Sequence, residues 1–70
     1  MTIYRTAIVK FNNGDLDVIH MDRWFSTHKA ATEYIEREYR AKVVKMFSGY
    51  VNKYNCSVWL ILNRKNMRLA

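Results

Sequence analysis

The strongest constraint on the fold is a stretch between residues 27 and 48 in which apolar residues recur every four positions. The recurring positions are Ala31, Ile35, Tyr39, Val43 and Phe47. Because residues four apart lie on the same side of a helix, this spacing predicts one long helix over residues 27–48, with its apolar side against a sheet. Ser26 or Thr27 can cap the start of this helix, and Gly49 can take the left-handed conformation that ends it.

A β-hairpin is predicted before the helix, over residues 3–25. Asn13 and Gly14 give the strongest short-range hairpin signal, an Asn-Gly pair between two runs of β-forming residues. A two-residue type I′ turn at this pair would place Phe11 opposite Leu16, with both side chains on the side of the sheet that faces the helix. The hairpin would therefore supply two strands of the sheet.

A third strand is predicted over residues 56–62, where apolar β-forming residues follow one another almost without interruption. Strand–helix–strand connections are right-handed, so this strand should run parallel to the second one, in the order 2-1-3 or 1-2-3. The predicted fold class is α+β with ββαβ order, one helix packing on one face of a small three-stranded sheet. Residues 1–70 would form a single domain with a basic tail at 63–70. The apolar third strand leaves open either a monomer or a homodimer that covers it.

The composition indicates a small basic globular protein. Twelve Lys and Arg residues against six Asp and Glu give a net charge of +6 on 70 residues. This charge favours acidic partners such as nucleic acid, an anionic membrane surface or an acidic protein patch. No apolar run approaches the ~18 residues of a membrane span and no signal-peptide pattern opens the chain, so a membrane is not expected among the partners. Cys56 is the single cysteine and cannot form an internal disulfide, which favours the cytoplasm.

The reactive side chains predict no catalytic, metal or cofactor site. His20, His28 and Cys56 do not match the paired spacing of zinc ligands. Asp17 and Asp22 would point to opposite sides of a strand, which excludes a carboxylate pair for acid–base catalysis. Two glycines in the whole chain are too few for a phosphate-binding glycine loop. We therefore expect neither an enzyme nor a cofactor.

Binding through exposed aromatic and basic side chains is the predicted function. Tyr, Trp and Arg are the usual energetic anchors of protein interfaces. The candidate residues for a larger protein partner are Trp24, Tyr34, Arg37, Arg40, Tyr50 and Tyr54. Direct nucleic-acid binding is the alternative, because cations contact phosphates while aromatic rings stack on bases. Its candidate residues are Lys29, Arg37, Arg40, Lys53, Arg64, Lys65 and Arg68.

In outline, the Asn13-Gly14 hairpin, the helix over 27–48 and the strand over 56–62 resemble very small accessory proteins of bacteriophages that inhibit or redirect host machines. The chain shares their short length, lack of proline and richness in Tyr and Met. The resemblance implies a protein that occupies a surface of a larger host protein in the host cytoplasm. Such host proteins often handle nucleic acid. No functional residue follows from the resemblance.

Overall fold

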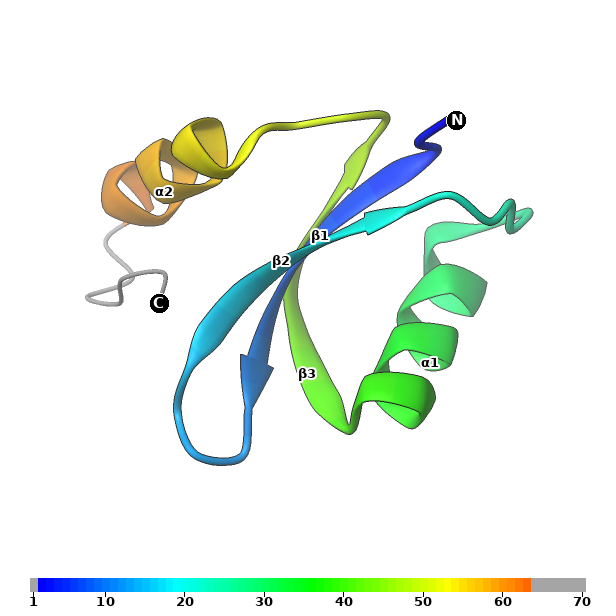
Figure 1. The fold of residues 1–70 in the computed structure, drawn as a ribbon, viewed down its shortest axis with the longest axis horizontal. Helices are drawn as coiled ribbons and strands as arrows, with labels where there is room; N and C mark the ends of the chain where they lie inside the picture. The colour runs from blue at the N-terminus through cyan, green and yellow to red at the C-terminus, as the bar shows by residue number, and fades with distance from the viewer. Residues whose placement is uncertain (1, 64–70) are drawn as a thin grey trace.

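The computed structural model describes residues 2–63, which form three strands and two helices (Figure 1). The elements in chain order are β1 (Arg5–Phe11), β2 (Leu16–Met21), α1 (His28–Tyr39), β3 (Ala41–Ser48) and α2 (Lys53–Leu62). The strands form one sheet in the order β2-β1-β3, and β1 is antiparallel to both neighbours. The α+β class and the ββαβ order are thus confirmed, the strand order is the first of the two alternatives left open, and α2 follows as a further element.

The predicted helix over 27–48 is wrong in its second half, because α1 ends at Tyr39 and residues 41–48 form β3. Arg40 lies between them in the left-handed conformation, with φ 51° and ψ 46°. A spacing of four places residues on one side of a strand as well as a helix, so the pattern could not distinguish the two. The β-branched pair Val43-Val44 favours the strand. Gly49 has the expected positive φ of 73°, but it follows β3.

The strand predicted over 56–62 is also wrong, since these residues belong to α2. The Asn52 side chain caps the helix by accepting a hydrogen bond from the Asn55 amide at 2.8 Å. Cys56 and Leu60, four positions apart, are buried against the sheet. A short apolar run cannot be assigned to helix or strand by periodicity alone, and the Asn52 cap was the local signal for a helix.

The hairpin turn is one residue longer than the predicted type I′ turn. The Gly14 amide donates to the Phe11 carbonyl, the Phe11 amide donates to the Asp15 carbonyl, both at 2.9 Å, and Gly14 has φ 94°. This is a three-residue loop with glycine in the left-handed position. Leu16 therefore pairs with Lys10 instead of Phe11. A shift of one residue moves the side chains of one strand to the other face, so the apolar residues of the hairpin serve both faces of the sheet.

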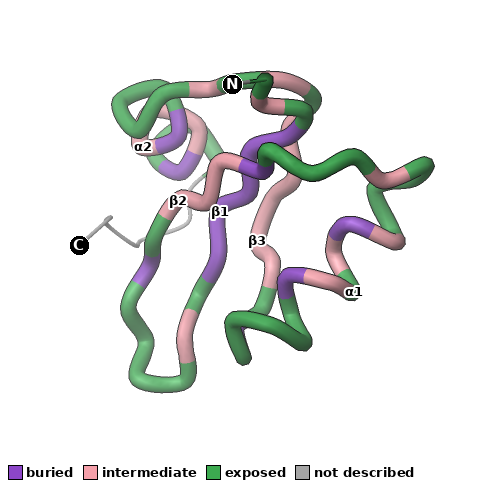
Figure 2. Tube along the Cα trace, turned by 45° about the vertical axis from the view of Figure 1, so that its right-hand side comes forward, coloured by how far each residue is buried: buried purple, intermediate pink, exposed green. Residues whose placement is uncertain are grey.

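Each face of the sheet packs against one helix. The core on the α1 side consists of Ala7, Val9, Met21, Ala31, Ile35 and Ala41. The core on the α2 side consists of Ile8, Leu16, Cys56 and Leu60. Figure 1 shows the two helices on opposite sides of the sheet, and Figure 2 shows that burial concentrates on the central strand β1. The alternation of Ala7, Ile8 and Val9 between the two cores explains why all three are fully buried.

The edge strand β3 contains an irregularity opposite the middle of β1. Ile8 pairs with Lys45 and Val9 pairs with Val43, which leaves Val44 as an extra residue. Such a bulge bends the strand and shifts its alternation by one position. As a result, Val43 and Met46, three positions apart, both pack on the α1 side, while Val44 and Phe47 both pack on the α2 side.

Candidate functional site

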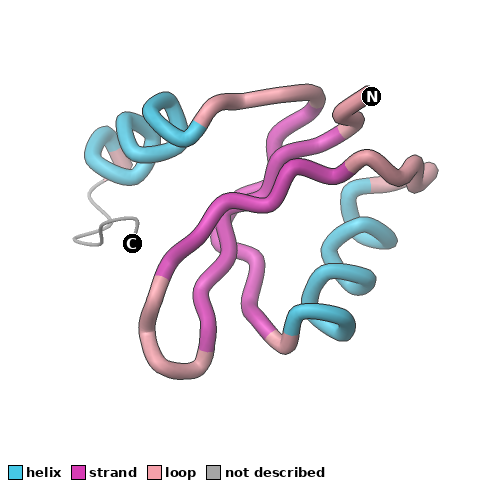
Figure 3. The backbone as a smooth tube through the Cα atoms, in the orientation of Figure 1, coloured by secondary structure: helices cyan, strands magenta, loops and turns pink. Residues whose placement is uncertain are grey.

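Three exposed aromatic side chains mark one end of the sheet. Tyr4 precedes β1, Trp24 follows β2 and Tyr50 follows β3, and they are 40%, 64% and 63% exposed. The chain enters or leaves all three strands at this same end (Figure 3), because Arg5 pairs with both Met21 and Ser48. We call this end of the sheet, with Tyr4, Trp24 and Tyr50, the aromatic end.

Trp24 is exposed but held in place by two neighbours. Its ring meets the Tyr4 ring edge to face at 5.7 Å, and the Arg5 guanidinium carbon lies 5.3 Å from the Trp24 ring centre. Arg5 is buried; its Nε donates to His28 Nδ1 and its Nη1 to the Phe25 carbonyl, both at 2.8 Å. These contacts join β1 to the loop before α1 and to the first residue of α1, and they combine hydrogen bonds from a charged group with a cation–π contact. The Trp24 ring is therefore exposed to solvent but held in place by contacts within the chain.

Tyr50 is supported by a separate set of contacts. Its ring stacks on His20 with ring centres 4.7 Å apart, and His20 Nε2 forms a 2.8 Å hydrogen bond with the Val51 carbonyl. The buried Thr6 hydroxyl donates to the Gly49 carbonyl at 2.8 Å and accepts from the Val51 amide at 2.9 Å. The connector between β3 and α2 is thus fixed to β1, and Tyr50 is fixed with it.

The structure does not bring the six predicted protein-binding residues together. Trp24 and Tyr50 lie at the aromatic end, together with Tyr4, which sequence reasoning missed. Tyr34 is half-buried, because its ring packs on Phe25 at 5.1 Å. The other three predicted residues are exposed and lie elsewhere. They are Arg37 on α1, Arg40 after α1 and Tyr54 on α2.

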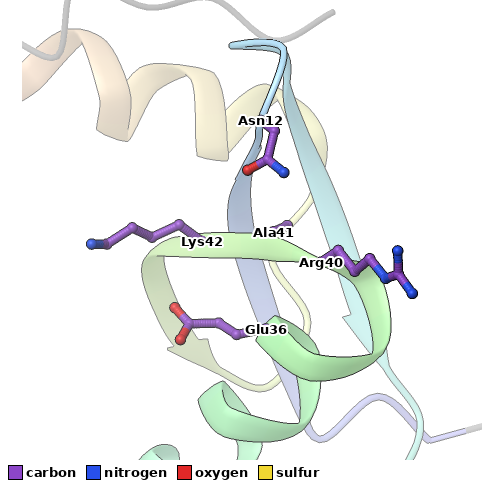
Figure 4. Close-up of a pocket in the computed structure, with 5 residues that line it drawn as sticks. All are labelled: Asn12, Glu36, Arg40, Ala41 and Lys42. Atoms are coloured by element: carbon purple, nitrogen blue, oxygen red, sulfur yellow. The ribbon is translucent and has the colours of Figure 1, made fainter.

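A shallow depression of ≈ 380 Å³ lies at the opposite end of the sheet from the aromatic end. Its lining residues are Asn12, Glu36, Arg40, Ala41 and Lys42. Figure 4 shows the Arg40 and Lys42 side chains extending in opposite directions. Glu36 Oε2 accepts a 3.0 Å hydrogen bond from the Val43 amide, which ties α1 to β3. The depression therefore lacks the converging polar groups of a ligand site.

The residues predicted to bind nucleic acid are divided between distant elements. Lys29 and Arg37 are on α1, Arg40 follows it, and Lys53 begins α2 on the other face of the sheet. The remaining candidates, Arg64, Lys65 and Arg68, lie outside the described residues. The described cations do not line a common groove.

The charges of the chain are strongly divided along the sequence. All six acidic residues and five of the twelve Lys and Arg residues lie within the first 39 positions. The remaining seven cations lie from Arg40 onward, where the sequence has no Asp or Glu. Lys45 belongs to this basic half, with its ammonium 5.6 Å from the Phe47 ring centre and 5.9 Å from that of Trp59. Such an asymmetry can be recognised in sequence, but only when net charge is counted by segment.

The outer side of α2 is a second exposed apolar surface. Tyr54, Ile61 and Leu62 are 75%, 73% and 75% exposed, and Val58 lies between them along the helix. Residues at i, i+4, i+7 and i+8 share one side of a helix, so these four form a single stripe. Sequence reasoning missed this stripe because it assigned residues 56–62 to a strand.

The described residues offer limited reactive chemistry. No group of three or more His, Cys, Asp or Glu residues within 2–63 could hold a metal ion. Cys56 is a fully buried free cysteine, and desolvation by burial raises the pKa of its thiol. Between residues 2 and 63, neither helix has the length and apolar character needed to cross a membrane.

Comparison with protein-family models, curated proteins and solved structures finds no match for this chain.

Proposed function

We propose that the protein is a non-enzymatic binding module that attaches to a larger protein through the aromatic end and inhibits or modulates it. The observation that supports this is the combination of exposure and order at Tyr4, Trp24 and Tyr50. Each ring presents a large apolar surface to solvent, and contacts within the chain hold each one in place. Rings of this kind are common energetic anchors of interfaces.

Order at these rings matters because binding costs conformational entropy. A side chain immobilised on binding loses about 0.5–1.5 kcal/mol of rotamer freedom, which reduces affinity. Trp24 is restrained before binding by Tyr4 and Arg5, and Tyr50 is restrained by His20. A partner groove that accepts these rings would therefore gain their burial at a reduced entropic cost.

The proposed partner is a larger host protein that handles nucleic acid, as the resemblance to phage accessory proteins implies. The experiment is capture of a partner from nuclease-treated bacterial lysate on the immobilised chain. We expect stoichiometric recovery of one protein, and loss of most of it with Trp24→Ala or Tyr50→Ala. The matched control is Tyr39→Ala, which removes a 47% exposed ring from α1, away from the aromatic end. Equal recovery with Trp24→Ala and with Tyr39→Ala would exclude the aromatic end as the contact.

Direct nucleic-acid binding is a second candidate function, supported by the acid-free sequence from Arg40 onward. Each phosphate that a cation neutralises releases condensed counterions, so the affinity should fall steeply with salt. Titration of labelled single- and double-stranded oligonucleotides at two salt concentrations tests this candidate. Binding no tighter than that of an unrelated basic protein of similar charge would argue against it.

A further inference from the structure

We propose that protonation of His28 releases Trp24 from its ordered position, so that acid pH weakens binding through the aromatic end. His28 acts through Arg5, whose Nε donates to His28 Nδ1 at 2.8 Å. The guanidinium carbon of Arg5 in turn lies 5.3 Å from the Trp24 ring centre. This regulation of the aromatic end rests on the proposed function, but the effect of His28 on Trp24 can be tested on the free chain.

The direction of the hydrogen bond between Arg5 and His28 fixes the protonation state of the histidine. An arginine guanidinium keeps its charge in proteins and carries only hydrogen-bond donors. The Nδ1 atom that accepts from it therefore lacks a proton, and the imidazole is neutral with its proton on Nε2. Histidine ordinarily changes its charge between about pH 5 and pH 8. The contact thus belongs to the form of His28 that predominates at the upper end of this range.

Protonation of His28 would disrupt the contact because Arg5 is buried. A protonated imidazole has donors on both nitrogens, so Arg5 Nε would lose its acceptor and face a second positive charge. A buried charged group without its hydrogen-bond partner is unfavourable. The backbone of Arg5 is held on both sides, since it pairs with Met21 and Ser48 in the sheet. We therefore expect the Arg5 side chain and the loop that carries Trp24 to move.

The charged groups around His28 are mostly positive. Arg5 faces it from β1, Lys29 follows it on α1, and the first turn of α1 has no acidic residue. The positive end of the α1 dipole disfavours a further positive charge at the same place. In the loop before α1, the charged residues are Asp22, which is exposed, and Arg23, which lies over two aromatic rings. Water screens an exposed carboxylate, so Asp22 offsets little of the repulsion from Arg5.

The second histidine of the aromatic end should not respond in the same way. His20 Nε2 contacts the Val51 carbonyl at 2.8 Å, and a carbonyl only accepts, so this nitrogen carries a proton. Both the neutral and the protonated imidazole can make that bond. The stacking of Tyr50 on His20 is therefore compatible with acid pH. The two supports of the aromatic end thus differ in their expected sensitivity to acid.

Nuclear magnetic resonance relaxation of the Trp24 indole N–H tests the proposal on the full chain. At about pH 7.5 the order parameter should be near that of ordered backbone, about 0.85, because Arg5 and Tyr4 hold the ring. At about pH 5, where histidine is protonated, it should fall below about 0.6. The indole of Trp59, which packs on Phe47 with ring centres 6.1 Å apart, is the internal reference and should not change.

Two variants separate the histidines. In His28→Asn, Oδ1 is as many bonds from the backbone as Nδ1 and accepts a hydrogen bond, but the amide does not become protonated. Trp24 should therefore stay ordered at both pH values in this variant. His20→Gln is the matched control, because its amide keeps a donor for the Val51 carbonyl and removes the other imidazole. This variant should retain the acid response of the wild type.

The proposal is overturned if Trp24 stays ordered in acid in the wild type, or if His28→Asn loses order as the wild type does. Loss of the acid response in His20→Gln would assign the response to the wrong histidine and overturn it as well. Circular dichroism verifies folding. If His28→Asn does not fold, the ring nitrogen shifts of His28 in the wild type replace it, and a midpoint that differs from that of Trp24 overturns the proposal. Failed partner capture at neutral pH, with Trp24 ordered, would count against the proposed function and not against the role of His28.

Discussion

The two helices cover opposite faces of the same sheet, but their outer sides differ. The exposed side of α1 carries charged residues such as Glu33 and Arg37, whereas that of α2 carries Ile61 and Leu62. The apolar residues of α1 therefore recur with the helical period, whereas the apolar residues of α2 lie on both sides of the helix. A helix with two apolar sides loses the periodic signal that identifies it in sequence. Apolar residues on both sides of α2 thus explain why sequence analysis did not predict this helix, and they also suggest an external contact.

The largest expected effect is a difference in stability between substitutions on the two sides of α2. Leu60 is 1% exposed and Leu62 is 75% exposed, so the same substitution tests both sides of one helix. Leu60→Ala should lower the free energy of unfolding by about 2–5 kcal/mol, because it leaves a cavity in the α2-side core. Leu62→Ala should change it by less than about 0.5 kcal/mol. Urea denaturation measures both values, and equal losses would mean that the outer side of α2 is covered in solution.

A smaller effect concerns the connector that leads into α2. Thr6→Val keeps the shape of the side chain but leaves the Gly49 carbonyl and the Val51 amide without their hydrogen-bond partner. Unsatisfied groups of this kind cost about 1–3 kcal/mol, which urea denaturation should detect. In this variant, hydrogen exchange should speed up more in α2 than in α1, because the connector leads into α2. Ser26→Ala, at an exposed hydroxyl, is the control, and uniform destabilisation of both helices would contradict a local role of Thr6.

The smallest effect is a pH dependence that originates on the α2 side. Burial raises the pKa of the Cys56 thiol above its ordinary value of 9.0. Above that pH the unfolded chain releases the thiol proton and the folded chain retains it, so alkaline pH favours unfolding. Between pH 7 and pH 9.5 the wild type should lose up to about 1 kcal/mol more stability than Cys56→Ala. Parallel denaturation curves at the two pH values measure this difference, and identical pH profiles would show that the thiol ionises equally in both states.

Sequence reasoning succeeded where a local signal was specific. The hydroxyl of Thr27 was one of two predicted caps and accepts a 3.0 Å hydrogen bond from the Ala30 amide. The Asn13-Gly14 pair correctly predicted the position of the hairpin. Its loop is one residue longer than predicted, and the pairing of the two strands therefore differs by one residue. The end of α1 was not predictable from the spacing of apolar residues, because Arg40 takes a left-handed conformation usually associated with glycine or asparagine.

The candidate surfaces were only partly predictable, since exposure depends on which face each residue occupies. Trp24, Tyr50 and Tyr54 were predicted as binding residues from residue type alone, and all three are exposed. Tyr34 was named in the same way, but it packs on Phe25. The support of Trp24 by Arg5 depends on a contact between residues 19 positions apart, which no local pattern encodes.

The bulge at Val44 also bears on how the sheet avoids polymerising with other chains. In the order β2-β1-β3 both outer strands have an open edge, and a flat open edge can template the addition of a foreign strand. The bulge interrupts the regular ladder of β3, and Lys42 and Lys45 add charge on the same strand. On β2, the exposed Asp17 adds a charge in the middle of the strand. These features disfavour amyloid-like stacking, so partners are expected to meet side chains rather than the backbone of the sheet.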